Sequence, residues 1–400
     1  MTVLDRFLKY VSFDTTSDEE SQTIPSTQKQ TVLGAYLVEE LKNAGCEDAR
    51  MDQYGYVYGT LPATEGCEDL PALGLIAHMD TSPAVSGTGI KAQILRYEGK
   101  DLNLGAAVLS ASAFPDLKNY VGQDLVVTDG TTLLGADDKA GVAEIVAACA
   151  EMTANPHRPH RKVAVCFTPD EEIGRGANKF DFSAFPAKVA YTVDGGEIGE
   201  IEYENFNAAS ARITVHGVNI HPGSAKDKMK NASLMGAEFI TRLPAAETPA
   251  HTEGYEGFYH LCDMKGDESE AVLNFIIRDH DRARFEQRKE TVRSLAAYLN
   301  TVYGEGTFEA EIRDSYYNMK EKILPHMELI ENAKAAMIAA GVEPKIVPIR
   351  GGTDGARLSY EGLPCPNLST GGANFHGIHE FIPVQSLQKM VTVLLELTKA

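Results

Sequence analysis

Short apolar segments that end in an acidic residue or a histidine recur through the first two hundred residues. They read ALGLIAH (72–78), TLLGADD (132–138), RKVAVCFTPDEEIG (161–174) and AKVAYTVDGGEIG (187–199). Helical patterns such as KAGVAEIVAACAEM (139–152) alternate with them, which is typical of an α/β layer fold. In open α/β sheets, ligands bind beyond the carboxyl ends of the strands. The pattern therefore predicts four apolar strands that each deliver a histidine or an acid to one site.

The pattern changes near residue 208. From there to about 315 the predicted order is β-α-β-β-α-β, the order of a ferredoxin-like split βαβ unit. Beyond it the α/β pattern returns, with a predicted helix over 326–341 and a last helix over 383–400. We therefore predict a large α/β domain (1–207 and 316–400) interrupted by an inserted α+β domain (208–315).

Charge and cysteine usage exclude several classes of protein. The formal net charge of −20 argues against nucleic acid or an anionic membrane as the main partner. No apolar run approaches the roughly 18 residues of a membrane span, and the N-terminus lacks a secretory signal pattern. Six cysteines without a C-x-x-C pair indicate reduced thiols, and hence a cytoplasmic protein.

The candidate site residues have structural alternatives when each is taken alone. His78 and Asp80 share one face of an extended chain, so they suit a metal ligand and its orienting carboxylate, or a solvated strand end. Of the adjacent acids 137 and 138, one can bind a metal and the other can stand at the helix start, or one can simply cap the helix. Glu171 and Glu172 point in different directions, so one can bind metal and the other reach a water, or both can line a surface turn.

Taken together, these residues indicate a metal centre. The candidate ligands are His78, Asp137, Glu172, Asp194 and His376. Imidazole and carboxylate ligands without thiolate suit zinc, cobalt or manganese. Five ligands exceed the three that a catalytic zinc takes, whereas one bridging carboxylate with two ligands on each side describes a two-metal site.

Several motifs resemble those of the metallopeptidases related to carboxypeptidase G and aminoacylase. In chain order they are HMD, GADDKAG, TPDEEIG, TVDGG, HPGSAK, NFIIRDHD, RGGTDGARLS and GGANFHGIHEF, and the resemblance covers essentially the whole chain. The stretch ETPAHTEGYEGFYHL (247–261) is similar to the aminotripeptidase branch of this family. The resemblance implies a zinc-peptidase catalytic domain with a mixed sheet, and a lid and dimerisation domain formed by the insert.

The resemblance also implies a role for each metal-site residue. Asp137 would bridge two Zn²⁺ ions per subunit, with Co²⁺ or Mn²⁺ as substitutes, and would be joined to Asp138 by a cis peptide bond. His78 and Asp194 would bind one ion, and Glu172 and His376 the other. Glu171 would be the general base, and Asp80 would orient the imidazole of residue 78.

Three further residues are candidates for contacts with the substrate. His221, in NIHPGSAK, resembles the lid-domain histidine that stabilises the oxyanion, in related dimers across to the partner's site; its alternative is an ordinary turn histidine. Arg278 and Arg350 are candidates to pair with the substrate carboxylate, because arginine binds carboxylates through two parallel hydrogen bonds. Solvated surface arginines are the alternative.

We therefore expect a cytoplasmic, homodimeric zinc aminopeptidase that removes the first residue of tripeptides. The same metal core also suits another amidohydrolase, such as a carboxypeptidase, a dipeptidase or an acylase, because specificity depends on pocket contacts. A third alternative, a metal-binding protein without catalysis, is disfavoured by Glu171, since binding alone needs no general base.

Overall fold

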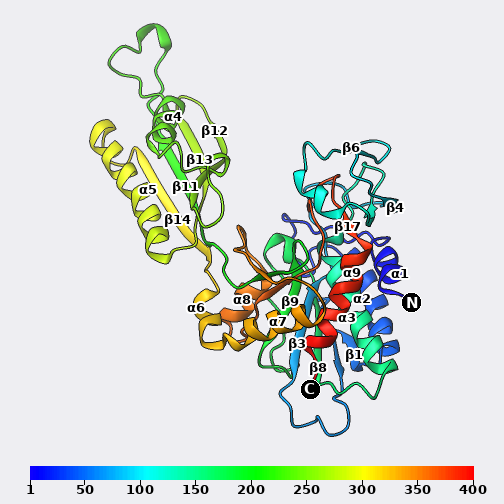
Figure 1. Ribbon diagram of the computed structural model, residues 1–400. Helices are drawn as coiled ribbons and strands as arrows, with labels where there is room; N and C mark the ends of the chain where they lie inside the picture. The colour runs from blue at the N-terminus through cyan, green and yellow to red at the C-terminus, as the bar shows by residue number, and fades with distance from the viewer. The chain divides into compact units, whose positions relative to one another are not determined.

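The computed structural model describes residues 1–400, and its contacts divide the chain into two compact units (Figure 1). The first unit comprises Met1–Tyr203, Glu321–Val347 and Thr353–Ala400. The second comprises Glu204–Lys320 and Pro348–Gly352. The short segment 348–352 groups with the second unit, whereas the sequence pattern had placed it in the larger domain.

A mixed sheet of eight strands forms the centre of the first unit, in the order β1-β2-β8-β3-β9-β16-β10-β15. The four neighbours β8, β3, β9 and β16 run parallel, and β1, β2 and β10 add antiparallel pairs. The parallel strands are nearly all apolar and buried, as expected for strands covered on both faces. The strand bounds are β1 Glu47–Met51, β2 Val57–Leu61, β3 Leu73–His78, β8 Val163–Thr168, β9 Ala190–Gly195, β10 Glu200–Glu202, β15 Lys345–Ile346 and β16 Asn367–Ser369.

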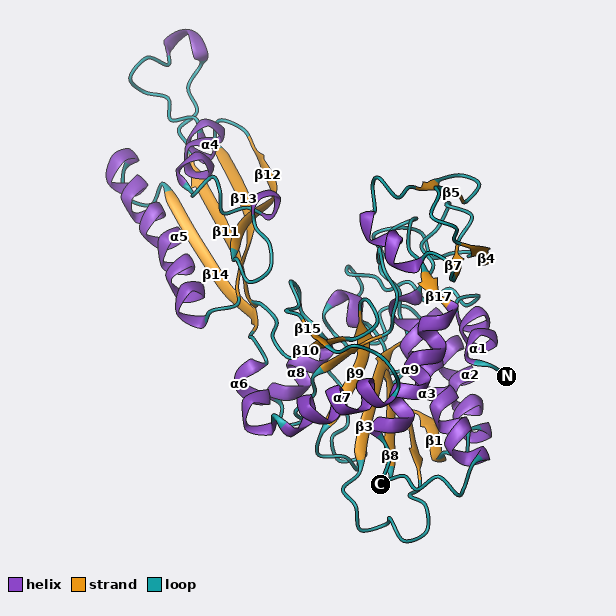
Figure 2. Ribbon diagram, viewed as in Figure 1, coloured by secondary structure: helices purple, strands orange, loops and turns teal.

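Helices cover this sheet (Figure 2). Helix α3 packs on β3 and β9, and α1 and α9 pack on α3. A separate buried cluster joins side chains of β2, β3 and β8 to Leu358 of α8. None of the helices is both long and apolar enough to span a membrane. The helix bounds are α1 Val3–Tyr10, α2 Lys29–Asn43, α3 Ala136–Ala154, α6 Lys320–Ile323, α7 Glu328–Ala339, α8 Asp354–Tyr360 and α9 Val384–Leu397.

Two small sheets complete the first unit. One has the order β17-β7-β4 and the other pairs β5 with β6, around a cluster that includes Tyr97 and Phe381. Residues 124–127 form β7 of the first small sheet, and no strand lies between β7 and α3. The prediction of an apolar strand that ends at Asp137 is therefore wrong. The strand bounds are β4 Gln93–Arg96, β5 Leu102–Asn103, β6 Val108–Leu109, β7 Asp124–Val127 and β17 Ile382–Pro383.

The second unit has the predicted order β-α-β-β-α-β. Its antiparallel sheet runs β12-β13-β11-β14, and α4 and α5 pack against it around a core that includes Phe239, Phe275 and Phe285. Helix α4 begins at Ala232, where the side chain of Asn231 accepts the N–H of Leu234 and caps the helix. The bounds are β11 Asn207–His216, α4 Ala232–Arg242, β12 Phe258–Gly266, β13 Glu270–Asp279, α5 Arg282–Tyr303 and β14 Phe308–Tyr316.

Candidate metal centre

The carboxyl ends of the four adjacent parallel strands deliver most of the candidate site. His78 is the last residue of β3, and Asp194 is the last but one of β9. Glu171 and Glu172 follow β8 in a short 3-10 helix, and His376 lies in the loop after β16. Because these strands are parallel neighbours, their ends meet at one edge of the sheet, as the sequence pattern predicted.

Asp137 reaches the same edge by a different route, from the first turn of α3. The Asp137–Asp138 peptide bond is cis, as the resemblance implied, and both residues have non-helical backbone angles. Glycine is required at position 141, since a Cβ there would lie 1.9 Å from the carbonyl oxygen of Val193 and 2.5 Å from Oδ1 of Asp138. The small residues around the two acids therefore let α3 approach the end of β9 closely.

Asp137 lies between the two candidate histidines. Its Oδ1 is 2.9 Å from Nε2 of His78, and its Oδ2 is 2.9 Å from Nε2 of His376. Asp194 Oδ1 lies 3.3 Å from Nε2 of His78, and Glu172 Oε2 lies 2.9 Å from Nε2 of His376. The structure thus brings all five candidate ligands together, with one carboxylate between a pair of ligands on each side.

The electrostatics of this cluster indicate a shortage of positive charge. Burial and the charge of Asp137 raise the pKa of Glu172 to about 7, and burial raises that of Asp194 to about 6. Hydrogen bonds to Asp137 and Glu172 raise the pKa of His376 to about 11. Burial opposes protonation of His78, yet the surrounding carboxylates raise its pKa well above the ordinary value. These raised pKa values mean that the histidines and acids of the cluster retain protons, and a bound cation could offset the same negative charge.

The donor set fits divalent metal ions. His78, Asp137 and Glu172 can place one ligand atom each within 4.8 Å of one another, and so can His78, Asp138 and Asp194. Oε1 of Glu172 and Oδ1 of Asp138 are buried and have no hydrogen-bond partner. A buried carboxylate oxygen without a partner is costly unless a cation lies against it. Imidazole and carboxylate donors without thiolate suit zinc, cobalt and manganese.

The side chain of Asp138 does not cap α3, which is one of the alternatives that the sequence left open. Its Oδ2 accepts the backbone N–H of His78 at 3.0 Å, and its side chain is fully buried. The residue therefore ties the first turn of α3 to the end of β3. The sequence predicts Asp138 at the helix start but does not indicate its contact with residue 78.

Asp80 has a wider role than sequence reasoning assigned to it. Nδ1 of His78 lies 3.1 Å from the carbonyl oxygen of Asp80 and 3.4 Å from its Oδ1. The same carboxylate accepts the backbone N–H groups of Glu171 and Glu172, at 3.0 and 3.2 Å. Asp80 thus connects the candidate ligand on β3 with the pair of acids after β8.

Asp170 is a further residue that sequence reasoning missed. It has a left-handed backbone (φ 59°) immediately before Glu171, and its carboxylate accepts hydrogen bonds from the backbone and hydroxyl of Ser26 and from the amide of Gln30. These bonds fix the turn that carries the two glutamates. The only sequence signal was a third acid in TPDEEIG, next to the two that were assigned.

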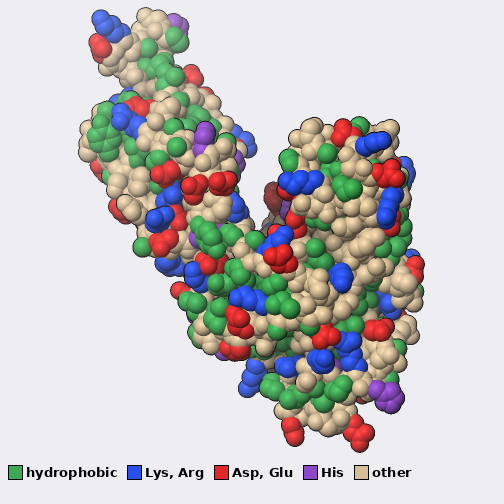
Figure 3. Space-filling model, viewed as in Figure 1, with side chains coloured by type: hydrophobic (Ala, Val, Ile, Leu, Met, Phe, Trp, Pro, Cys, Tyr) green, Lys and Arg blue, Asp and Glu red, His purple; other side chains and the backbone are tan.

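A pocket of about 580 Å³ opens beside the metal-site residues. Glu172 and His376 line it together with Ser82 and the acidic run Asp18–Glu20. On the face shown in Figure 3, acidic and basic side chains are interspersed on both units. The pocket beside Glu172 is thus locally acidic on a surface of mixed charge.

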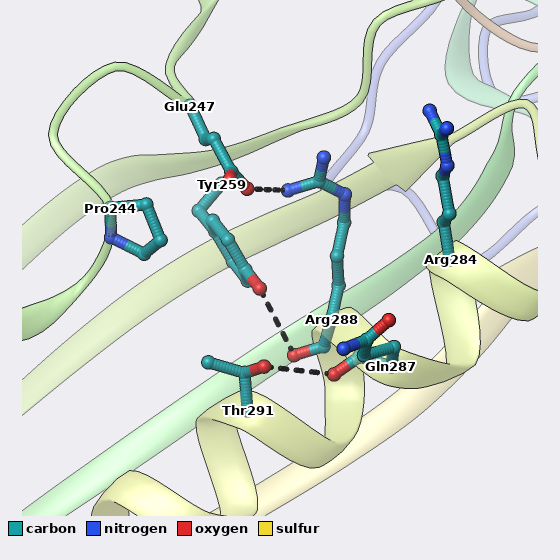
Figure 4. Close-up of a pocket in the computed structure, with 7 residues that line it drawn as sticks. All are labelled: Pro244, Glu247, Tyr259, Arg284, Gln287, Arg288 and Thr291. Carbon is teal, nitrogen blue, oxygen red and sulfur yellow. Dashed lines mark hydrogen bonds and ion pairs between the residues drawn. The ribbon is translucent and has the colours of Figure 1, made fainter.

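The second unit has a pocket of its own, of about 320 Å³, beside α5 (Figure 4). Arg288 crosses this pocket and pairs with Glu247, which belongs to the stretch 247–261. The Nε atom of Arg288 lies 2.7 Å from Oδ2 of Asp279. The hydroxyl of Tyr259 points to the backbone carbonyl of Arg288. The stretch 247–261 is therefore anchored to α5, and the pocket contains none of the candidate ligands.

The three candidate substrate-contact residues all belong to the second unit. His221 is exposed, and its Nδ1 accepts the N–H of Gly223. Arg278 donates to the carbonyls of Ala209 and Ile277. The guanidinium of Arg350 holds the 252–256 loop through the carbonyls of residues 252, 254 and 256 and a threonine hydroxyl. The contacts of Arg350 explain why 348–352 groups with the second unit. Contact of Arg278 and Arg350 with the substrate stays a prediction.

At this edge of the sheet five candidate imidazole and carboxylate ligands converge, and one of them, Glu172, has a second glutamate beside it; this is the arrangement of a metallopeptidase-type centre. The model of peptidase family M20/M25/M40 matches residues 128–400, and the chain belongs to this family. Proteins named peptidase T are similar to this chain over almost its whole length. That of Desulfitobacterium hafniense is 57% identical and that of Halothermothrix orenii 54%, each over 99% of this chain and 97% and 98% of the relative.

Solved structures share the fold. A tripeptidase from Staphylococcus aureus superposes with a TM-score of 0.79 at 21% identity, covering 99% of this chain and 97% of that one. A dinuclear metal-binding peptidase of the M20 family from Bacillus subtilis superposes with a TM-score of 0.66 at 14% identity, covering 99% and 96%. The expected α/β zinc-peptidase fold with a mixed sheet is thereby confirmed.

Proposed function

We propose that this protein is a metal-dependent aminopeptidase that hydrolyses the N-terminal peptide bond of tripeptides. The observation that carries the proposal is the placement of Asp137 between His78 and His376, beside an acid pair that has one member left over for proton transfer. Full-length relatives named peptidase T support the same activity. Two Zn²⁺ ions per subunit are the proposed cofactors, with Co²⁺ or Mn²⁺ as substitutes.

The ligands divide into two sets around Asp137. His78 and Asp194 would hold one ion, and Glu172 and His376 the other. A pair of bound divalent ions supplies Lewis-acid chemistry that activates water and polarises a carbonyl group. The chain itself supplies the acid–base step, because the carboxylate of Glu171 takes the proton of the attacking water and passes it to the leaving amine.

The position of Glu171 suits this proton transfer. Burial, followed by the charge of Asp194, raises the pKa of its carboxyl well above the ordinary value, which makes the carboxylate a stronger base. Asp80 accepts its backbone N–H at 3.0 Å, which fixes the backbone of Glu171 next to Glu172, while the contact with His376 belongs to Glu172. Proton transfer and metal binding thus fall to neighbouring residues.

The acidic pocket beside Glu172 favours an aminopeptidase over a carboxypeptidase. Asp18, Glu19 and Glu20 line it, and they complement the positive charge of a free peptide N-terminus. A substrate carboxylate would be repelled there. We therefore place the N-terminal ammonium of the substrate on this side of the metal centre.

A panel of tripeptides tests the proposed activity. Free tripeptides should lose their first residue with metal-loaded protein, and N-acetylated forms should be poor substrates because the acetyl group removes the positive charge. Chromatography of the products identifies the residue that is released. Release of the C-terminal residue, or equal hydrolysis of the acetylated peptides, would contradict the proposal.

His221 is the proposed donor to the oxyanion of the tetrahedral intermediate. Loss of one such donor costs about 10²- to 10³-fold in kcat in other enzymes, and we expect His221→Ala to cost as much. Metal content and KM should change much less, because the residue is not a ligand. His260→Ala, which removes another exposed imidazole of the second unit, is the matched control and should keep full kcat.

The same residue tests the proposed homodimer. If the imidazole serves the partner's site, mixing Glu171→Gln chains with His221→Ala chains should restore part of the activity. The mixed dimer then contains one intact metal centre and one intact donor. No recovery, with subunit exchange shown by mass spectrometry, would confine residue 221 to its own chain or remove it from catalysis.

All six cysteines are free thiols, which suits the cytoplasm as the proposed location.

A further inference from the structure

The buried carboxylate of Glu380 accepts four consecutive backbone N–H groups at the start of α3. Oε2 accepts those of Leu134 and Gly135, at 2.6 and 2.9 Å, and Oε1 accepts those of Ala136 and Asp137, at 2.7 and 3.2 Å. The residue is only 2% exposed. The first N–H groups of a helix have no partner within the helix, so a distant side chain here does the work of a cap.

The sequence around α3 provides no cap of its own. Gly135 occupies the N-cap position with a left-handed backbone (φ 77°) and has no side chain to accept an N–H. Asp137 and Asp138 then depart from helical angles. The carboxylate of Glu380 is therefore the acceptor for the backbone N–H groups of residues 134–137, including that of Asp137.

Glu380 also stands at the base of the loop that carries His376. Phe381, the residue that follows Glu380, exchanges two backbone hydrogen bonds with Ala373, at 2.9 and 3.1 Å. These bonds close the loop. The C-terminal segment continues into α9, which lies beside α3 (Figure 1). One side chain therefore joins the two backbone segments whose functional groups, Asp137 Oδ2 and His376 Nε2, lie 2.9 Å apart.

We infer that Glu380 is a positioning residue that sets the distance between Asp137 and His376, and so the affinity of the centre for its metal ions. It offers no ligand atom itself, since both of its oxygens are occupied by N–H groups. Hydrogen bonds to an ionised acceptor are about twice as strong as neutral ones, which makes a carboxylate suited to this task. The inference rests on the proposed metal centre, but not on the choice of substrate.

Glu380→Gln is the direct test. The amide has the same size, but its NH₂ group would face two N–H donors, so half of the contacts are replaced by repulsion. We expect affinity for Zn²⁺ to fall about 10- to 100-fold, the range typical of residues behind metal ligands. Competition with a chromophoric chelator measures this affinity. Faster amide hydrogen exchange in the 134–137 segment should accompany the loss.

Glu144→Gln is the matched control. This glutamate lies fully buried in the same helix, and neither of its carboxylate oxygens has a partner. The same chemical change there should leave Zn²⁺ affinity and exchange at 134–137 unchanged. Wild-type Zn²⁺ affinity in Glu380→Gln, or an equal loss in Glu144→Gln, would overturn the inference.

A second variant covers the case in which Glu380→Gln fails to fold. Glu380→Asp keeps the charge but retracts it by one methylene, so Zn²⁺ affinity should fall less, and kcat should fall more than KM rises. Unchanged affinity in this variant would also overturn the inference. Wild-type protein that binds Zn²⁺ but leaves tripeptides intact would refute the proposed activity alone, and wild-type protein that binds no Zn²⁺ would refute the inference as well.

Discussion

Glu171→Gln should keep its metal ions and lose about 10²- to 10⁴-fold in kcat, the usual contribution of a general acid–base group. The amide fills the same space, and the hydrogen bond from its backbone N–H to Asp80 does not involve the side chain. Only the ability to take a proton is removed. Metal analysis of the purified variant beside steady-state kinetics on a tripeptide measures both quantities.

The adjacent residue supplies the contrasting variant. Glu172 is the proposed ligand, 2.9 Å from His376, so Glu172→Gln should lower metal content as well as kcat. A Glu171→Gln variant with near-normal kcat would sink the assignment of the base. Loss of metal from both variants would show that the two glutamates do not divide the work as proposed.

Asp137→Ala should lower metal content and activity together. The two oxygens of this carboxylate face His78 and His376, so its removal weakens both metal positions at once. The loss of affinity should exceed the roughly 10- to 100-fold typical of a residue behind the ligands. Metal analysis after dialysis against a chelator measures it.

Asp69→Ala, in an exposed loop of the same unit, is the control for loss of an acid and should keep both ions. Asp137→Asn keeps one oxygen, and we expect it to retain more metal than the alanine variant. Two metal ions per chain in Asp137→Ala, at wild-type affinity, would remove the residue from the position between the two ions.

The strand pattern of the sequence predicted the fold because short apolar runs indicate which segments are buried as strands. Strands β3, β8 and β9 are apolar along their length, and each carries a histidine or an acid at or just past its end. The prediction of a strand immediately before Asp137 is wrong. The fourth parallel strand is β16, which leads to His376, whereas the run before Asp137 forms no strand, since periodicity cannot distinguish a short apolar loop from a short strand.

The sequence by itself determined the order of elements, the split βαβ pattern of the second unit and the chemical types of the candidate ligands. Only the tertiary structure decided which groups each charged side chain contacts. Asp80 accepts the N–H groups of Glu171 and Glu172, Arg350 holds a loop of its own unit, and Glu380 caps a helix that begins more than two hundred residues earlier. Local propensity reports hydrogen bonds between near neighbours in the chain, whereas a buried carboxylate takes whichever donors the folded chain brings to it.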